Sequence, residues 1–153
     1  MSTIEFSKIL AISTNGIVPS ATPTIYFDGT NAITSTCYSV PVLAKKVDTL
    51  GLQWTTPVGS TLVGTLALQG SNDAGQLEQN MTPDVTLTNW ATISFWDESS
   101  ASWTQSKAIA SGASSGIETV QVFSARWYRW LFTFASGSGD LVLKVQEKAD
   151  GGR

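Results

Sequence analysis

Residues 126–134 read RWYRWLFTF and carry large side chains on both faces of one extended segment. Side chains alternate between the two faces of a strand, so the more apolar set is expected to face a core. That set comprises Tyr128, Trp130, Phe132 and Phe134. The other set contains Trp127, Arg129 and Leu131, which is too apolar for a face left in water. We expect this second face to be covered by a loop, by the N-terminal segment or by another subunit.

The same period of two recurs along most of the chain. It is clearest in the segments 4–12, 38–42, 50–54, 66–68, 120–122 and 141–145. An amphipathic helix has a period of 3.6, which the chain largely lacks. The pattern predicts an all-β fold of about eight strands, a single antiparallel β-sandwich of the jelly-roll kind, as one domain over 1–153. The segments 128–134 and 141–145 are expected to form a hairpin across the glycine-containing residues 135–139.

Two stretches interrupt the regular spacing of strands and are predicted to be long loops, 71–89 and 97–116. Trp96 and Trp103 lie in or beside the second one. A flat indole accepts the apolar face of a sugar ring, so the two residues are candidates for stacking on a glycan. They can equally fill the open end of the sandwich beneath their own loop.

The candidate interface residues are Trp127, Arg129, Leu131, Trp96 and Trp103. Trp, Tyr and Arg are enriched where proteins bury surface against each other, which favours contact with another subunit. Cover by the same chain is the alternative for the first three.

Composition excludes several kinds of chemistry. The 153 residues include no His and a single Cys, Cys37. Catalysis that depends on His and zinc sites built from His or several Cys are therefore ruled out. Only 14% of the residues are charged, against about 25% in typical soluble domains, and 19 serines and 19 threonines supply polar surface instead. We expect no catalytic residue, no cofactor and no metal.

Four carboxylates in the predicted loops are the remaining candidates for chemistry, Asp73, Asp84, Asp97 and Glu98. A pair of them could hold calcium or act in hydrolysis. Carboxylates beside Asn, Gly and Ser more often bond the backbone of their own turn, which is the interpretation we favour.

Charge and hydropathy bear on partners and location. The net charge is −3 and no basic stripe is present, so we expect no nucleic-acid partner. The apolar runs fall far short of the roughly 18 residues needed to cross a bilayer, so no membrane association is expected. The first residues lack the pattern of a signal peptide, which predicts synthesis in the cytoplasm without export.

Two motifs together resemble a known group of proteins. Residues 64–73 (GTLALQGSND) are followed at a distance by Trp90, and residues 124–130 read SARWYRW. The chain then closes with SGSGDLVL at 136–143 and KADGGR at 148–153. Over roughly residues 47–153 the sequence is similar to discoidin-like sandwiches and to small virion proteins of tailed bacteriophages. The resemblance implies that Asn72, Asp73 and Arg129 are structural.

By association, the resemblance implies a non-enzymatic phage virion protein. We expect a capsid cement or decoration protein on the particle surface. We expect it to assemble as a symmetric homo-oligomer, namely a trimer. Its partners are then other copies of itself and a major capsid or tail protein. The alternatives are a tail or neck component and a carbohydrate-binding module for host attachment, in which case a glycan is the ligand.

Overall fold

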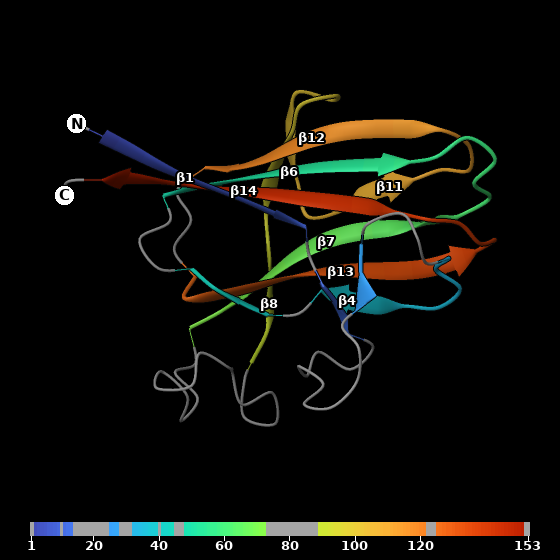
Figure 1. The fold of residues 1–153 in the computed structure, drawn as a ribbon, viewed down its shortest axis with the longest axis horizontal. Helices are drawn as coiled ribbons and strands as arrows, with labels where there is room; N and C mark the ends of the chain where they lie inside the picture. Colours follow the sequence, from blue (N-terminus) through green and yellow to red (C-terminus); the bar gives the residue numbers. More distant parts are fainter. Residues whose placement is uncertain are drawn as a thin grey trace.

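Two antiparallel sheets face each other across an apolar core in the computed structural model of the chain. One layer contains β12 (Ser114–Gln121), β6 (Thr49–Thr56) and β14 (Val142–Gly151), and the other contains β7 (Val63–Ser71) and β13 (Trp127–Ser136) (Figure 1). The structure describes residues 2–9, 11–13, 25–27, 32–39, 41–44, 48–72, 89–121 and 125–151. The six-stranded sheet has the order β1 (Ser2–Ile9), β14 (Val142–Gly151), β6 (Thr49–Thr56), β12 (Ser114–Gln121), β9 (Phe95–Asp97) and β10 (Ser102–Thr104).

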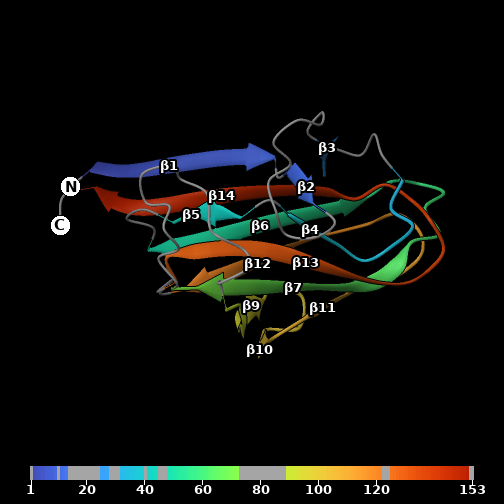
Figure 2. The same cartoon turned by 90° about the horizontal axis from the view of Figure 1, so that it is seen from below.

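The eight-stranded sheet contains the segment 126–134. Its order is β11 (Lys107–Ile109), β7 (Val63–Ser71), β13 (Trp127–Ser136), β4 (Cys37–Ser39), β2 (Ala11–Ser13) and β3 (Ile25–Tyr26). Two short strands lie beside this path: β5 (Val42–Leu43) pairs with β13, and β8 (Ala91–Ile93) pairs with β7. Figure 2 shows the two sheets overlying each other with their long strands running in roughly the same direction, as expected for aligned packing.

The predicted all-β sandwich is confirmed. Four strands of one sheet, β1-β14-β6-β12, face four of the other, β4-β13-β7-β11, which gives the eight-stranded framework of a jelly roll. The described residues hold more strands than the eight expected, because six further strands of two or three residues extend the two sheets.

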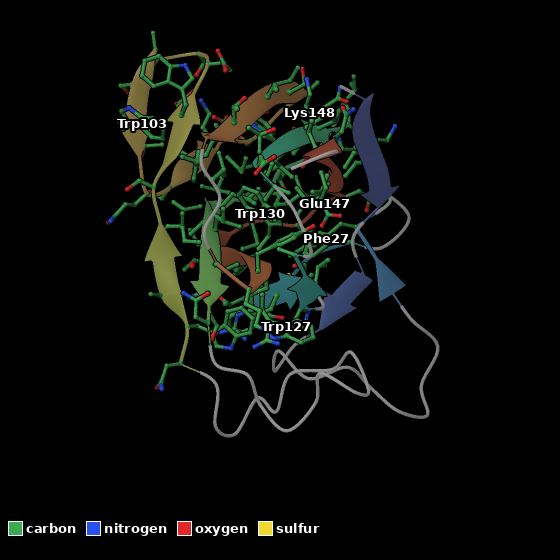
Figure 3. The ribbon with its side chains drawn as sticks, turned by 90° about the vertical axis from the view of Figure 1, so that its left-hand side faces the viewer. Phe27, Trp103, Trp127, Trp130, Glu147 and Lys148 are labelled. Atoms are coloured by element: carbon green, nitrogen blue, oxygen red, sulfur yellow. The ribbon has the colours of Figure 1, made fainter. Side chains whose placement is uncertain are left out.

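Alternation along the strands builds the core. In β6, Leu50, Leu52 and Trp54 are buried while Gln53 is exposed. Phe95 of one sheet meets Trp130 of the other edge-on, with ring centroids 5.9 Å apart, and Trp130 lies between the layers (Figure 3). Each fully buried large apolar side chain contributes about 1.5–3 kcal/mol.

The predicted hairpin between 128–134 and 141–145 is wrong. β13 pairs with β7, β4 and β5, whereas β14 pairs with β1 and β6, so the connection at 137–139 crosses from one sheet to the other. Thr61 holds this crossing: its N–H donates to the carbonyl of Ser138 at 3.0 Å, and its hydroxyl accepts the N–H of Ser138 at 3.0 Å. Gly137 has φ +77°, and a Cβ there would collide with the carbonyl oxygen of Thr61. Alternation indicates which face a residue occupies, but not which strand lies beside it.

The predicted loop over 97–116 is also wrong. This stretch contains β10, β11 and the start of β12. The first two strands are only three residues long, too short for a period of two to stand out among the serines. Most of the other predicted loop, 73–88, lies outside the described residues.

Candidate functional site

Part of the outer face of the eight-stranded sheet, around Trp127 and Arg129, is covered by the chain itself. Arg129 is only 9% exposed. Its guanidinium carbon lies 4.2 Å from the ring centroid of Tyr38 and 4.3 Å from that of Trp90, and its Nε donates to Gln69 Oε1 at 2.8 Å. Burial lowers the pKa of Arg129 below its ordinary value. Two aromatic rings and an amide thus enclose the guanidinium, as expected for a structural arginine.

Trp127 shares this face, which we call the covered face, with Arg129 and Leu131. It has no exposed surface, and Figure 3 places it on the side of β13 that is turned away from the core residue Trp130. Leu131 is partly exposed. Of the alternatives for this face, cover by the same chain is the one that the structure shows for Trp127 and Arg129. A contact of Leu131 with another chain stays a prediction.

The outer face of the six-stranded sheet differs, because large apolar side chains on it remain exposed. Trp103 is 54% exposed and Ile117 is 56% exposed. Trp96 is half-buried and lies opposite Trp103 in the β9–β10 ladder, with the two rings 5.7 Å apart at an angle of 75°. The structure therefore brings the two predicted tryptophans together as a pair, and Figure 3 shows Trp103 at the edge of the sheet.

A shallow groove continues this face toward the middle of the sheet. Register aligns Trp103, Trp96, Thr119, Gly51 and Gln146 in one row across five strands. Gly51 has no side chain, and a groove of about 160 Å³ lies here, lined by Gly51, Leu52, Gln53, Ile117, Lys144, Val145 and Gln146. We call Trp96, Trp103, Ile117, Gln53, Lys144 and Gln146 the open face. It combines indole rings with amides and an ammonium group.

Between the sheets, Tyr128 and Glu147 form one polar link. The hydroxyl of Tyr128 in β13 donates to Oε1 of Glu147 in β14 at 2.5 Å, and both side chains are buried. Burial, together with this hydrogen bond, raises the pKa of Tyr128 far above its ordinary value. The link joins the two layers on the core side of β13.

A second polar link joins the sheets near β9 and β11. Lys107 Nζ lies 2.9 Å from Oδ1 and 2.8 Å from Oδ2 of Asp97, and 3.7 Å from Oε1 of Glu118. Trp54 Nε1 donates to the same Glu118 oxygen at 3.1 Å. Glu118 is 1% exposed, and its Oε2 has no hydrogen-bond partner within the described part of the chain. Burial raises the pKa of Glu118.

Asp97 has the predicted turn chemistry. Its Oδ1 accepts the N–H of Ser99 at 2.8 Å, the hydroxyl of Ser99 at 2.6 Å and the N–H of Ser100 at 3.3 Å. Burial raises the pKa of Asp97, but the hydrogen bonds from Lys107 and from the two serines outweigh it, so the pKa lies below its ordinary value. Glu98 is exposed and accepts the hydroxyl of Thr119 at 3.2 Å. Asp73 and Asp84 lie outside the described residues.

Sequence reasoning missed Lys107 and Glu118. Glu118 could have been noticed, because it stands two residues before Val120 and therefore on its inward face. Asn72 behaves as the resemblance implies, since its Oδ1 accepts the backbone N–H of Arg126 at 2.8 Å.

The described residues offer few candidates for other kinds of functional site. They contain no group of three His, Cys, Asp or Glu side chains placed to hold a metal ion. Cys37 is buried, and burial raises the pKa of its thiol to about 12. No helix in the part of the chain that the structure describes is long and apolar enough to cross a membrane.

Comparison with known proteins gives one finding on the fold. No family model matches the sequence, and neither does any curated protein. Among solved structures, the chain is similar to the SPBc2 prophage-derived protein YomS, with a TM-score of 0.54 and 11% identity over 97% of this chain and 96% of that one. The two chains share a fold over nearly their whole length.

Proposed function

We propose that the chain is a non-enzymatic structural protein of a phage virion, a cement or decoration protein that forms a symmetric homo-oligomer on the particle surface. The observation that carries the proposal is the open face, where Trp103 and Ile117 are more than half exposed on a regular sheet. Exposed aromatic and aliphatic side chains grouped on one face are typical of a surface that binds another protein.

The energetics favour this surface over the other. Full burial of a large apolar side chain contributes about 1.5–3 kcal/mol, so covering Trp103 and Ile117 in a contact gives a useful driving force. The exposed Lys144 and Lys148 lie on the same face of the sheet and can form a polar rim. A closed ring such as a trimer covers the face on every copy, in keeping with the symmetry of most homo-oligomers.

Two other features support the proposal. The fold is shared with a prophage-derived protein, and the sequence motifs at 64–73 and 124–130 resemble phage virion proteins. In addition, Asp97, Glu118 and Glu147 are all hydrogen-bonded inside the fold and are not open to a substrate. Attachment to a major capsid protein, rather than to a tail or neck protein, is the form of the proposal that we favour.

The test measures assembly. Light scattering should give the mass of an oligomer for the purified chain, and the chain should co-sediment with capsid shells. Ile117→Lys, which places a charge on the open face, should reduce both. Val58→Lys is the matched control, because Val58 is 90% exposed but lies in the turn between β6 and β7. A wild-type chain that is monomeric and does not bind shells would overturn the proposal.

A carbohydrate-binding module for host attachment is the second candidate. The observation that favours it is the exposed ring of Trp103 beside Trp96, in line with a groove that carries the amides of Gln53 and Gln146. Binding on a glycan array that is lost in Trp103→Ala and in Trp96→Ala, but kept in Val58→Ala, would support it. If the chain binds no glycan on the array, the carbohydrate-binding function is excluded, and the proposal of assembly is not affected.

A further inference from the structure

Three ionisable side chains meet at the edge of the core, and each comes from a different strand. Asp97 of β9 and Glu118 of β12 are directly opposed in the six-stranded sheet, while Lys107 comes from β11 of the other sheet. Directly opposed residues on one face have Cβ atoms about 4.5–5.5 Å apart. The two carboxyl groups and the amine therefore share one small, largely water-excluded space.

The amine of Lys107 is in direct contact with the carboxyl group of Asp97. Lys107 Nζ contacts both carboxylate oxygens, at 2.9 Å and 2.8 Å. This double contact leaves the nitrogen within roughly 3.5 Å of Cγ and close to the plane of the carboxyl group, so a turn of that group about its Cβ–Cγ bond brings the amine over the face of the carbon, where addition occurs. The side chains of Lys107 and Asp97 are only 14% and 10% exposed, so few water molecules compete with the amine.

One oxygen of Asp97 already sits among donors that stabilise negative charge. Oδ1 accepts two backbone N–H groups, from Ser99 and Ser100, and the hydroxyl of Ser99. The same set of donors suits the oxyanion that forms when a nucleophile adds to a carboxyl carbon. Oδ2, which accepts a hydrogen bond only from Lys107 among the described residues, is the oxygen free to leave.

Glu118 supplies a proton carrier. It is 1% exposed, its Oε1 lies 3.7 Å from Lys107 Nζ, and its Oε2 has no partner among the described residues. Burial raises the pKa of Glu118, so its carboxylate accepts a proton more readily than an ordinary carboxylate does. A purely structural ion pair has no need of this second, unpaired carboxyl oxygen.

We propose that Lys107 and Asp97 condense to form an intramolecular isopeptide bond between β11 and β9. The ammonium of Lys107 first gives one proton to Oδ2 of Asp97, which it contacts, so that a neutral amine faces a neutral carboxyl group. The amine adds to Cγ and moves an electron pair onto Oδ1. Glu118 then carries a second proton from the nitrogen to Oδ2, which leaves as water while the electron pair on Oδ1 re-forms the C=O bond. The overall change is –NH₃⁺ plus –COO⁻ to –CO–NH– plus H₂O, and Glu118 ends as it began.

The bond joins the two sheets through two of their short strands. Both β9 and β11 are only three residues long. A covalent link between them constrains the unfolded chain, as a disulfide does, in a chain whose single Cys cannot form one internally. The reaction occurs once in each molecule and is a self-modification, not enzymatic turnover.

Mass spectrometry of the purified, denatured full-length chain tests the proposal. The expected mass is lower than that of the sequence by one water molecule. Trypsin should fail to cut after Lys107 and should release residues 47–126 as one peptide that lacks one water. The full sequence mass, with normal cleavage after Lys107 even after long incubation of the folded protein at neutral pH, would overturn the proposal.

Three variants separate the bond from the ion pair. Lys107→Arg keeps the charge but cannot condense, so it should fold, as judged by circular dichroism, and show its full mass. Asp97→Asn should condense with loss of ammonia and give the same final mass as the wild-type product. Glu118→Gln should fold but form the bond at least tenfold more slowly. A water-sized loss that persists in Lys107→Arg would assign the modification to other residues and contradict the proposal.

Discussion

The two outer faces of the sandwich use similar residues for opposite purposes. On the covered face, Trp127 has no exposed surface and Arg129 is 9% exposed. On the open face, Trp103 is 54% exposed, and its one aromatic neighbour among the described residues is Trp96. Large aromatic residues outside the core therefore do not by themselves identify an interface. Their position within the sheet decides whether the chain covers them.

Position explains the difference physically. β13 lies in the interior of its sheet, between β7 on one side and β4 and β5 on the other. Side chains from these neighbours and from the segment before β8, such as Tyr38 and Trp90, reach over Arg129. β10 is an edge strand, paired only with β9 among the described strands. Its outer face therefore has neighbours on one side alone.

The largest effect is expected for Trp127→Ala. Removing a fully buried indole should lower the free energy of unfolding by about 3–5 kcal/mol, measured by chemical denaturation. If Trp127→Ala still folds, it should assemble like the wild type, because Trp127 has no exposed surface that could contact another chain. A loss below about 1 kcal/mol would mean that the covered face is not closed in solution.

The next effect concerns Tyr128, the neighbour of Trp127 on the core side. Tyr128→Phe removes the hydrogen bond to Glu147 and should lower the free energy of unfolding by about 1.5–3 kcal/mol. Because the pKa of Tyr128 is raised in the fold, its contribution is fully present below the ordinary value of 10.0 and is lost as the pH rises above it. Denaturation curves between neutral and strongly alkaline pH should show this decline in the wild type and a weaker one in Tyr128→Phe. Equal declines would contradict the assignment.

A smaller effect is expected for Arg129→Lys, which keeps the positive charge and removes the planar guanidinium. The loss of stacking on Tyr38 and Trp90 should lower the free energy of unfolding by about 1–2 kcal/mol. Thermal unfolding of the variant measures it. A stability equal to that of the wild type would show that charge alone, and not stacking, matters at this position.

The smallest effect on stability is expected for Trp103→Ala. Substitution of an exposed residue should change the free energy of unfolding by less than about 0.5 kcal/mol. Oligomer formation, followed by sedimentation velocity, should nevertheless weaken. A variant that is strongly destabilised would show that Trp103 stabilises the fold and is not mainly a contact with another chain.

Local alternation predicts which side chains point inward but not which strands are neighbours. The inward set Tyr128, Trp130 and Phe132 follows directly from the period of two. The failed hairpin at 135–139 and the missed strands in 97–116 depend on pairing between distant segments. The same limit applies to Lys107, Asp97 and Glu118, whose meeting requires β9, β11 and β12 to be placed in two different sheets.

The sequence predicts that the covered face is covered, but it leaves several alternatives for what covers it. Trp127, Arg129 and Leu131 are recognisable as a second apolar face, but the residues that enclose Arg129, Tyr38 and Trp90, are distant in the sequence. The pairing of Trp96 with Trp103 depends on a short β9–β10 ladder that no local pattern indicates.

Hydroxyl-radical footprinting of the free chain and of the assembled particle tests the contrast between the two faces most directly. Oxidation of each tryptophan is read out by mass spectrometry of its peptide. The account predicts that Trp103 is oxidised in the free chain and protected on assembly, whereas Trp127 is protected in both. Oxidation of Trp127 in the free chain, or equal oxidation of Trp103 in both states, would contradict it.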